Sequence, residues 1–119
     1  MATPRAARSA DAFRQATLRR LRRALRDVED PELPVSVVDL GLIVSLDYDP
    51  ASRRASVRLT FTRMGCPAMD LIQSDIRERL LRDPQVDSVD LDVGWDPVWT
   101  RRRLSDRARV QLRAIGVAP

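Results

Sequence analysis

Hydrophobic residues recur at helical spacing near the start of the chain, with arginines between and beside them. The apolar positions are Leu18, Leu21, Leu25 and Val28. This period predicts an amphipathic helix over about residues 11–28 with its arginine side toward solvent. Residues 1–10 contain a proline and no apolar period, so we expect them to form a flexible N-terminal arm.

Two later segments alternate hydrophobic and polar residues with the two-residue period of half-buried strands. The alternations lie within 41–48 and 54–62, and the residues between them, Asp49-Pro50-Ala51-Ser52, are typical of a turn. The apolar members are Leu42, Val44, Leu46, Tyr48, Val57, Leu59 and Phe61. The pattern therefore predicts an antiparallel hairpin.

A second helical stripe follows Pro67, which suits the first helical position because its ring presets φ and its missing N–H is not needed there. The apolar positions of the stripe are Met69, Ile72, Ile76 and Leu80. We expect this helix over about 67–82, with Cys66 as its N-cap. A third strand, reached through the helix as a crossover, is predicted from the apolar residues of 86–93.

The last apolar stripe predicts a C-terminal helix that Ser105 caps and Gly116 ends. The fold class is then α+β: a small two-layer domain in the order helix, hairpin, helix, strand, helix, with a mixed sheet of three or more strands. We expect residues 11–119 to form this single domain.

Three carboxylates lie within four residues in the loop after the first helix, at Glu29, Asp30 and Glu32. Pro31 and Pro34 make this loop rigid. Carboxylates at this spacing could bind a hard cation. The simpler interpretation is that they neutralise the arginine-rich helix before them.

Asp39 is an acid between two apolar residues, just before Gly41. It can brace the turn by hydrogen bonding, as Asp side chains often do, or it can face a site at Cys66. The brace is the simpler of the two interpretations.

Both tryptophans of the chain, Trp95 and Trp99, lie four residues apart around Pro97. Rings of this size need burial or a partner. They either close the end of the sheet or form a patch that binds a partner protein or a second copy, where exposed aromatic side chains act as anchors.

The charge is unevenly distributed along the chain. All 21 basic residues are arginines, and residues 27–100 carry 15 acids against seven arginines, so the positive charge lies toward the two ends. A nucleic-acid surface would combine positive charge with stacking aromatics on one folded face, and we see no such face. An arginine-rich helix can also lie on a membrane, but a solvated outer face is its commoner meaning.

No apolar run approaches the roughly 20 residues of a bilayer span, so no membrane association is expected. The single cysteine cannot form an internal disulfide, and a cytoplasmic protein is expected. The chain also contains neither His nor Lys, which removes the usual neutral-pH base and the Schiff-base nucleophile. We therefore do not expect an enzyme.

Cys66 is the central candidate for chemistry. It stands at the turn from the second strand to the second helix, where Gly65 permits a sharp bend. The start of a helix favours an anion, so this thiol should ionise more readily than usual and become able to bind metal or attack an electrophile. A lone free cysteine can equally be a small buried apolar residue, and the residues alone leave both interpretations open.

Three signatures occur in order along the chain. They are Asp30-Pro31-Glu32-Leu33-Pro34 with Asp39-Leu40-Gly41, then Gly65-Cys66-Pro67, then Trp95-Asp96-Pro97-Val98-Trp99-Thr100. Together, over roughly residues 18–119, they resemble the iron-sulfur cluster assembly (metal-sulfur cluster biosynthesis) family that includes SufT and PaaD. The run after Gly65 and the C-terminal residues are similar to PaaD, without the cysteine-rich tail with which PaaD-type chains usually continue.

The resemblance implies a factor for iron-sulfur protein maturation that acts as scaffold, carrier or adaptor, with Cys66 as the residue that binds metal or cluster. The positions implied to support it are Asp30, Glu32, Asp39, Thr62 and Gly65. The implied partners are iron-sulfur assembly proteins or client apoproteins, met in part through Trp95 and Trp99. The alternative is a PaaD-like accessory subunit of a phenylacetyl-CoA oxygenase complex, in phenylacetate degradation, that binds no cluster.

An iron-sulfur cluster needs about four ligands, mostly thiolates, and this chain offers one thiol and no imidazole. A single chain therefore cannot hold a cluster alone. We expect any cluster to be transient and shared between chains or with a partner, and we expect a homodimer.

Overall fold

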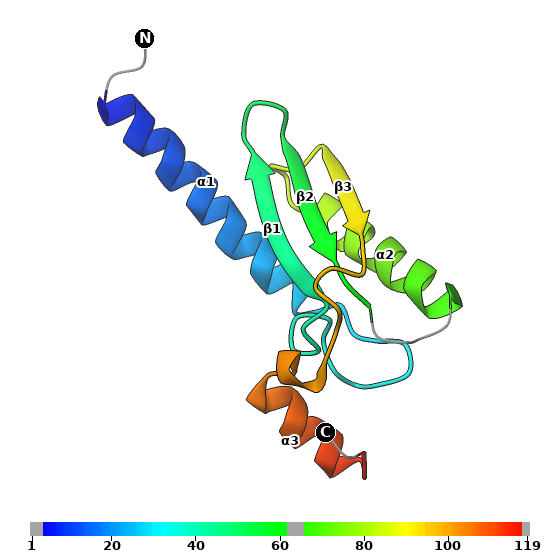
Figure 1. Cartoon of the computed structure of the whole chain (residues 1–119). Helices are drawn as coiled ribbons and strands as arrows, with labels where there is room; N and C mark the ends of the chain where they lie inside the picture. Colours follow the sequence, from blue (N-terminus) through cyan, green and yellow to red (C-terminus); the bar gives the residue numbers. More distant parts are fainter. Residues whose placement is uncertain (1–3, 62–65, 118–119) are drawn as a thin grey trace.

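The computed structural model describes residues 4–61 and 66–117, with the side chains of 8–61 and 69–117. Its elements follow the predicted order of helix, hairpin, helix, strand and helix (Figure 1). They are α1 (Pro4–Leu25), β1 (Ile43–Asp49), β2 (Arg54–Leu59), α2 (Cys66–Leu81), β3 (Ser88–Val93), the 3-10 turn η1 (Arg101–Arg103) and α3 (Asp106–Ala114).

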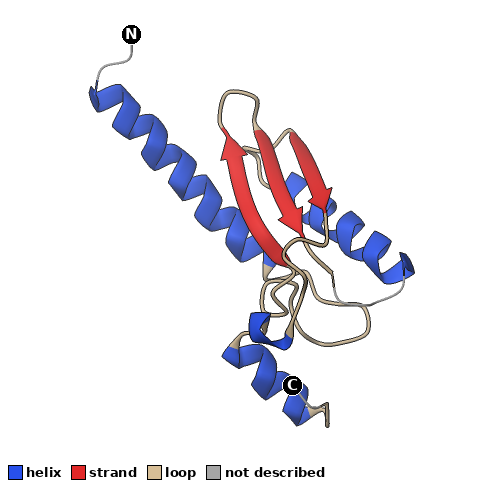
Figure 2. Ribbon diagram, viewed as in Figure 1, coloured by secondary structure: helices blue, strands red, loops and turns tan. Residues whose placement is uncertain are grey.

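The three strands form one sheet in the order β1-β2-β3 (Figure 2). β1 and β2 pair antiparallel as a hairpin, whereas β3 lies parallel to β2 and is reached through α2. The predicted mixed sheet and helical crossover are confirmed. The strands are shorter than their alternation suggests, because the buried residues Phe61 and Val86 lie outside the ladder.

The helices α1 and α2 touch each other, and they contact β1 and β3 respectively, so they form one layer against one face of the sheet. Ala55, Val57 and Leu59 of β2 are buried beneath that layer, while Arg54 and Arg58 of the same strand are exposed on the opposite face. This is the predicted two-layer α+β arrangement. The buried apolar side chains form one continuous cluster.

The first helix extends further toward the N-terminus, and ends earlier, than the period predicts. Residues 4–10, expected to belong to a flexible arm, are the first turns of α1, since Pro4 suits a helix start and alanines favour propagation. The helix ends at Leu25, and Asp27 and Val28 follow in a turn with N–H bonds to the carbonyls three residues back. Val28 is nevertheless buried, which is why the apolar period continued to it. No helix among the described residues is long and apolar enough to cross a bilayer.

Two ion pairs tie α1 to other elements. Arg20 binds the carboxylate of Asp83, just after α2, with an Nε to Oδ2 distance of 3.0 Å. Burial alone would raise the pKa of Asp83, but hydrogen bonds from Arg20 and from the Gln85 N–H outweigh it and lower that pKa. At the middle of α1, Arg14 pairs with Asp47 of β1 and, with the N–H of Tyr48, lowers the pKa of Asp47.

Both predicted ends of the last helix are confirmed. Ser105 is the N-cap of α3, and its hydroxyl oxygen accepts the Ala108 N–H. Gly116 follows the helix at φ +80°, and the Gly116 and Val117 N–H groups bond back to the carbonyls of Arg113 and Leu112. α3 lies beyond one end of the sheet, away from α1 (Figure 1).

Candidate functional site

The first and third signature segments meet at the end of the sheet where β2, the strand that leads toward Cys66, and β3 terminate. Directly after β2, the Thr60 N–H donates to the Leu42 carbonyl at 2.9 Å, which brings in the loop between α1 and β1. On the other side, the Gly94 N–H donates to the Leu59 carbonyl at 2.9 Å, and the buried Thr60 hydroxyl donates to the Pro97 carbonyl at 2.8 Å. The acidic loop, the approach to the cysteine turn and the tryptophan segment therefore share one end of the molecule.

Cys66 is the first residue of α2, a helix of 16 residues. The predicted strand and helix on either side of it are present, with the helix beginning one residue earlier than expected, and the predicted turn at Gly65 lies outside the described residues. The first N–H groups of a helix have no partner within it, so the backbone at Cys66 lies at the positive end of the helix dipole. Thr62 and Gly65 lie outside the described residues, as does the side chain of Cys66.

Asp30 is turned into the protein, with 4% of its surface exposed. Its Oδ1 accepts the N–H groups of Glu32, at 2.7 Å, and Leu33, at 3.1 Å, which holds the proline-bounded loop in an Asx-type turn. Its Oδ2 is buried and has no hydrogen-bond partner among the described residues. One oxygen of Asp30 is therefore fully used in shaping the loop and the other is not.

The other acids of this loop do not gather around Asp30. Glu29 and Glu32 are exposed, and no group of three or more acidic or cysteine side chains within the described residues is arranged to hold a metal ion. The three acids of this loop therefore form no hard-cation site among the described residues.

Asp39 acts as the predicted brace, but with a partner far along the chain. Its Oδ2 accepts the hydroxyl of Ser36 at 3.1 Å, and its Oδ1 accepts the hydroxyl of Ser105 at 2.8 Å. The Ser105 N–H also donates to the Asp39 carbonyl at 2.9 Å. Sequence reasoning identified Ser105 only as a cap, and nothing in the local pattern signals its bonds to Asp39.

Gly41 lies against the C-terminal segment. Its φ of +75° favours glycine, and a Cβ placed there would collide with the backbone carbonyl and Cβ of Arg103. The Arg103 guanidinium donates to the Gly41 carbonyl at 2.7 Å and to the Ile43 carbonyl at 3.3 Å. The Asp39-Leu40-Gly41 turn is therefore a docking point for η1 and α3.

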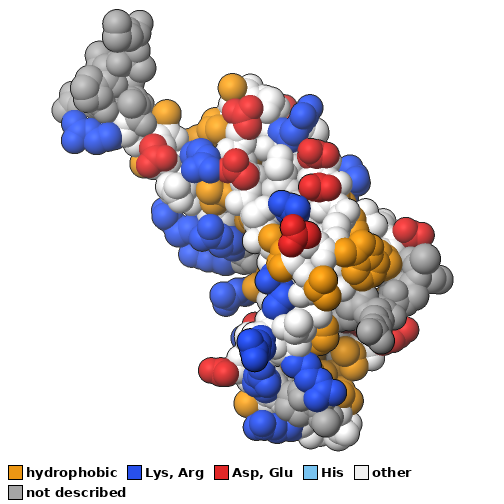
Figure 3. Space-filling model, viewed as in Figure 1, with side chains coloured by type: hydrophobic (Ala, Val, Ile, Leu, Met, Phe, Trp, Pro, Cys, Tyr) orange, Lys and Arg blue, Asp and Glu red, His pale blue; other side chains and the backbone are white. Residues whose placement is uncertain are grey.

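The two tryptophans have different environments. Trp99 is half-buried against the core, and its indole N–H donates to the Leu40 carbonyl at 2.7 Å. Trp95 is 58% exposed and Val98 is 69% exposed. Hydrophobic side chains gather on the surface at the end of β3 and over the segment that follows (Figure 3). Trp99 thus closes the end of the sheet, as one interpretation predicted, and Trp95 is free to meet a partner.

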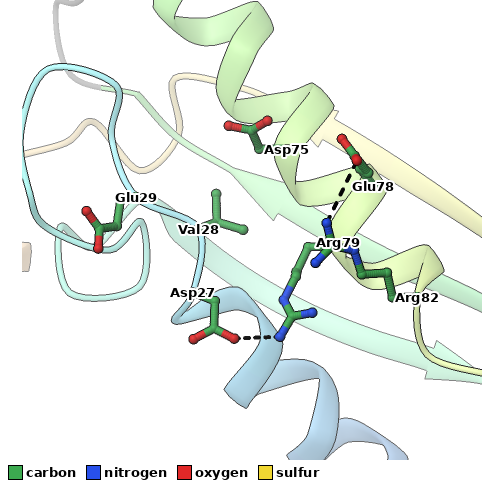
Figure 4. A pocket seen from close by; sticks show the side chains of 7 residues that line it. All are labelled: Asp27, Val28, Glu29, Asp75, Glu78, Arg79 and Arg82. Atoms are coloured by element: carbon green, nitrogen blue, oxygen red, sulfur yellow. Dashed lines mark hydrogen bonds and ion pairs between the residues drawn. The ribbon is translucent and has the colours of Figure 1, made fainter.

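A cavity of about 340 Å³ lies between the end of α1 and α2 (Figure 4). It is lined by charged side chains, two of which, Arg79 and Asp27, form an ion pair with an N to O distance of 2.6 Å. Glu29 of the acidic loop lines it, but Asp30, Glu32, Asp39 and the two tryptophans do not. The candidate site is therefore a surface at the end of the sheet, not this cavity.

The sequence matches known proteins over most of its length. The pattern of a family described as iron-sulfur cluster assembly protein matches residues 18–91. The Fe-S protein maturation auxiliary factor YitW of Bacillus subtilis is 36% identical over 89 residues, 75% of this chain and 86% of that protein. The Fe-S protein maturation auxiliary factor SufT of Staphylococcus aureus is 32% identical over 85 residues, 71% of this chain and 96% of that protein.

The fold is also known. A crystal structure from Bacillus anthracis, described as a domain of unknown function, superposes with a TM-score of 0.79 at 33% identity, covering 87% of this chain and 97% of that one. A further relative, a putative 1,2-phenylacetyl-CoA epoxidase subunit of Escherichia coli, is 30% identical over 96 residues, 80% of this chain and 56% of that protein. Both the SufT-like and the PaaD-like resemblances found in the sequence are confirmed.

Proposed function

Because this chain belongs to the iron-sulfur cluster assembly protein family, we propose that it serves the maturation of iron-sulfur proteins through Cys66. The observation that carries the proposal is the convergence of the acidic loop, the strand leading to Cys66 and the tryptophan segment at one end of the sheet. The relatives YitW and SufT, which match this chain over most of their length, are both named maturation auxiliary factors.

The position of Cys66 suits a reactive thiol. At the first residue of α2 the helix dipole stabilises an anion, and the thiolate is the form of cysteine that ligates iron. Asp30, whose second oxygen is buried without a partner among the described residues, contributes one further acidic group to this end of the molecule.

The donor set of one chain does not fit a resident cluster. A cluster needs about four ligands, and the chain supplies one thiol and no imidazole. In this proposal the cluster is cargo, held briefly by Cys66 together with ligands from a second copy or a partner. A homodimer that brings two Cys66 side chains together is the simplest such assembly, and a transient site of this kind suits transfer.

Trp95 is proposed as the contact for assembly proteins or client apoproteins. It is a large aromatic side chain left 58% exposed, and Val98, three positions along the chain, is 69% exposed. Aromatic anchors of this kind carry much of the binding energy at protein interfaces. Trp99 has a structural role, since its indole bonds to the Leu40 carbonyl.

The role proposed is that of an auxiliary factor and not of an enzyme, in keeping with the names of the two relatives. The second candidate is an accessory subunit of a phenylacetyl-CoA oxygenase complex that binds no cluster. Similarity to the putative epoxidase subunit of Escherichia coli favours it.

Anaerobic reconstitution with iron and sulfide distinguishes a carrier from an adaptor. Wild type, Cys66→Ala and Trp95→Ala are compared by absorption spectra and by mass on a sizing column. A carrier forms a cluster in a wild-type dimer, loses it in Cys66→Ala and keeps it in Trp95→Ala, because Trp95 is not a ligand. If wild type binds no iron, direct carriage is wrong.

A further inference from the structure

A groove between α1 and the edge strand β1 is not used by the proposed function. It encloses about 250 Å³ and is called here the α1–β1 groove. Its floor is aliphatic, formed by Leu25, Val38, Ile43, Val44 and Leu46. All of these except Leu25 are only half-buried, so the floor is incompletely covered.

Two arginines line the α1 side of the groove. Arg22 and Arg26 are exposed, and neither makes an ion pair among the described residues. They lie one helical turn apart, where like charges repel each other. Basic side chains gather along α1 in the surface view (Figure 3), and an acidic ligand would relieve this repulsion.

The third wall is the open edge of the sheet. Within the part of the chain that the structure describes, β1 pairs only with β2, and arginine side chains bond to its outer edge near both ends. Arg14 donates to the Tyr48 carbonyl at 3.1 Å, and Arg103 donates to the Ile43 carbonyl at 3.3 Å. Because peptide groups alternate in direction along a strand, Leu46 turns its N–H and carbonyl outward, as Tyr48 does.

We propose that the α1–β1 groove binds an extended segment of a partner protein in which aliphatic and acidic side chains alternate. The aliphatic side chains cover the floor, the acidic ones pair with Arg22 and Arg26, and the backbone bonds to the outward peptide groups of Leu46. This is strand addition with charge selection. The site is distinct from Cys66, which begins the helix that packs over β3 at the other edge of the sheet.

Two other occupants fit less well. A second copy paired along β1 would bring two sets of the same arginines to one seam, where they repel. A nucleic acid would meet the arginines, but the lining of the groove contains no aromatic side chain on which a base could stack.

A displayed library of random peptides tests the proposal. It is selected on the full chain, and the enriched peptides are synthesised and titrated by fluorescence anisotropy. We expect the enriched peptides to carry alternating aliphatic and acidic residues. N-methylation of alternate peptide bonds should abolish their binding. Enriched peptides without acidic residues would overturn the proposal. So would binding that survives N-methylation of either set of alternate peptide bonds.

Charge reversal on one helix provides the matched control. Arg22→Glu with Arg26→Glu should weaken binding of the winning peptide by about tenfold or more. Arg19→Glu with Arg23→Glu makes the same change in charge outside the groove and should change the affinity by less than about threefold. Equal losses in the two double variants would mean that only net charge matters, and the proposal would be wrong.

Two further arms complete the test. Single-stranded poly(dT) should bind more weakly than the peptide at physiological salt, and tighter binding that both double variants abolish would identify a nucleic-acid surface instead. Cys66→Ala should bind the peptide as wild type does. The proposal for the α1–β1 groove and the proposed function of Cys66 can therefore be confirmed or contradicted independently.

Discussion

Asp39 and Ser105 are 66 positions apart and are joined by two hydrogen bonds, one through the Asp39 carboxylate and one through its backbone carbonyl. The Ser105 hydroxyl that donates to Asp39 also accepts an N–H of the first turn of α3, from Ala108. The turn before β1 and the start of the last helix are therefore held by one shared network. An acid stands between two apolar residues because it fastens the C-terminal segment to the sheet end.

Asp39→Ala should detach this segment. The change leaves the Ser36 and Ser105 hydroxyls without their acceptor and should lower the free energy of unfolding by about 2 kcal/mol, with Asp39→Asn costing less because one acceptor remains. Urea denaturation measures the loss, and hydrogen exchange should show it in α3. Asp90→Asn, an exposed carboxyl on the outer face of the sheet, should change stability by less than about 0.5 kcal/mol.

Gly41→Ala should be more costly than Gly116→Ala, although both glycines have a positive φ, of +75° and +80°. At Gly116 no atom lies within 4 Å of the added Cβ, so only the backbone conformation opposes the change, at about 1–2 kcal/mol. At Gly41 the Cβ also meets the backbone of Arg103. Thermal and urea unfolding of the two variants gives the difference, and equal losses would contradict the close contact.

Removing the Asp83 carboxylate should make the protein less sensitive to acid. The folded pKa of Asp83 is lowered, so its contribution to stability is present above the unfolded pKa, near 3.9, and is lost as pH falls through the folded value. Asp83→Asn should cost about 1 kcal/mol at neutral pH, since the partner Arg20 is half-exposed, and the two unfolding curves should converge in acid. Asp70→Asn, an exposed change on α2, should stay parallel to wild type across this range.

Substitutions at the two tryptophans should have different effects, one on stability and the other on partner binding. Trp99→Phe removes the donor to the Leu40 carbonyl and should lower the free energy of unfolding by about 1 kcal/mol. Trp95→Ser should leave stability within about 0.5 kcal/mol of wild type, because the ring is mostly exposed, and should reduce client maturation in cells. A large loss of stability in Trp95→Ser would instead make this ring structural.

The sequence was sufficient to predict a helix or strand wherever its hydrophobic periodicity agrees with the residues that mark its ends. The hairpin, the crossover helix and the caps at Ser105 and Gly116 are all encoded within a few neighbouring residues, so they could be predicted. The end of α1 could not, because the buried Val28 continues the apolar period in a turn that is no longer α-helical. The spacing of apolar residues shows which side chains are buried, and buried side chains continue beyond the last residue of the helix.

The candidate site was predicted only in part for a different reason. The three signatures could be found, but the meeting of the first and third at the end of β2 depends on long-range bonds such as Thr60 to Pro97. The same holds for the bond between Asp39 and Ser105 and for the close approach of Gly41 to Arg103. The different environments of Trp95 and Trp99 likewise depend on which ring can reach the Leu40 carbonyl.

The most direct measurement of the central claim is complementation in the native host. A strain without this gene receives wild type, Cys66→Ala, or Asp90→Asn as a control that leaves the site intact, and the cluster content of its iron-sulfur enzymes is measured. The account predicts full loading with wild type and with Asp90→Asn, and loading at the level of the deletion strain with Cys66→Ala at equal protein abundance. Full loading with Cys66→Ala would contradict it.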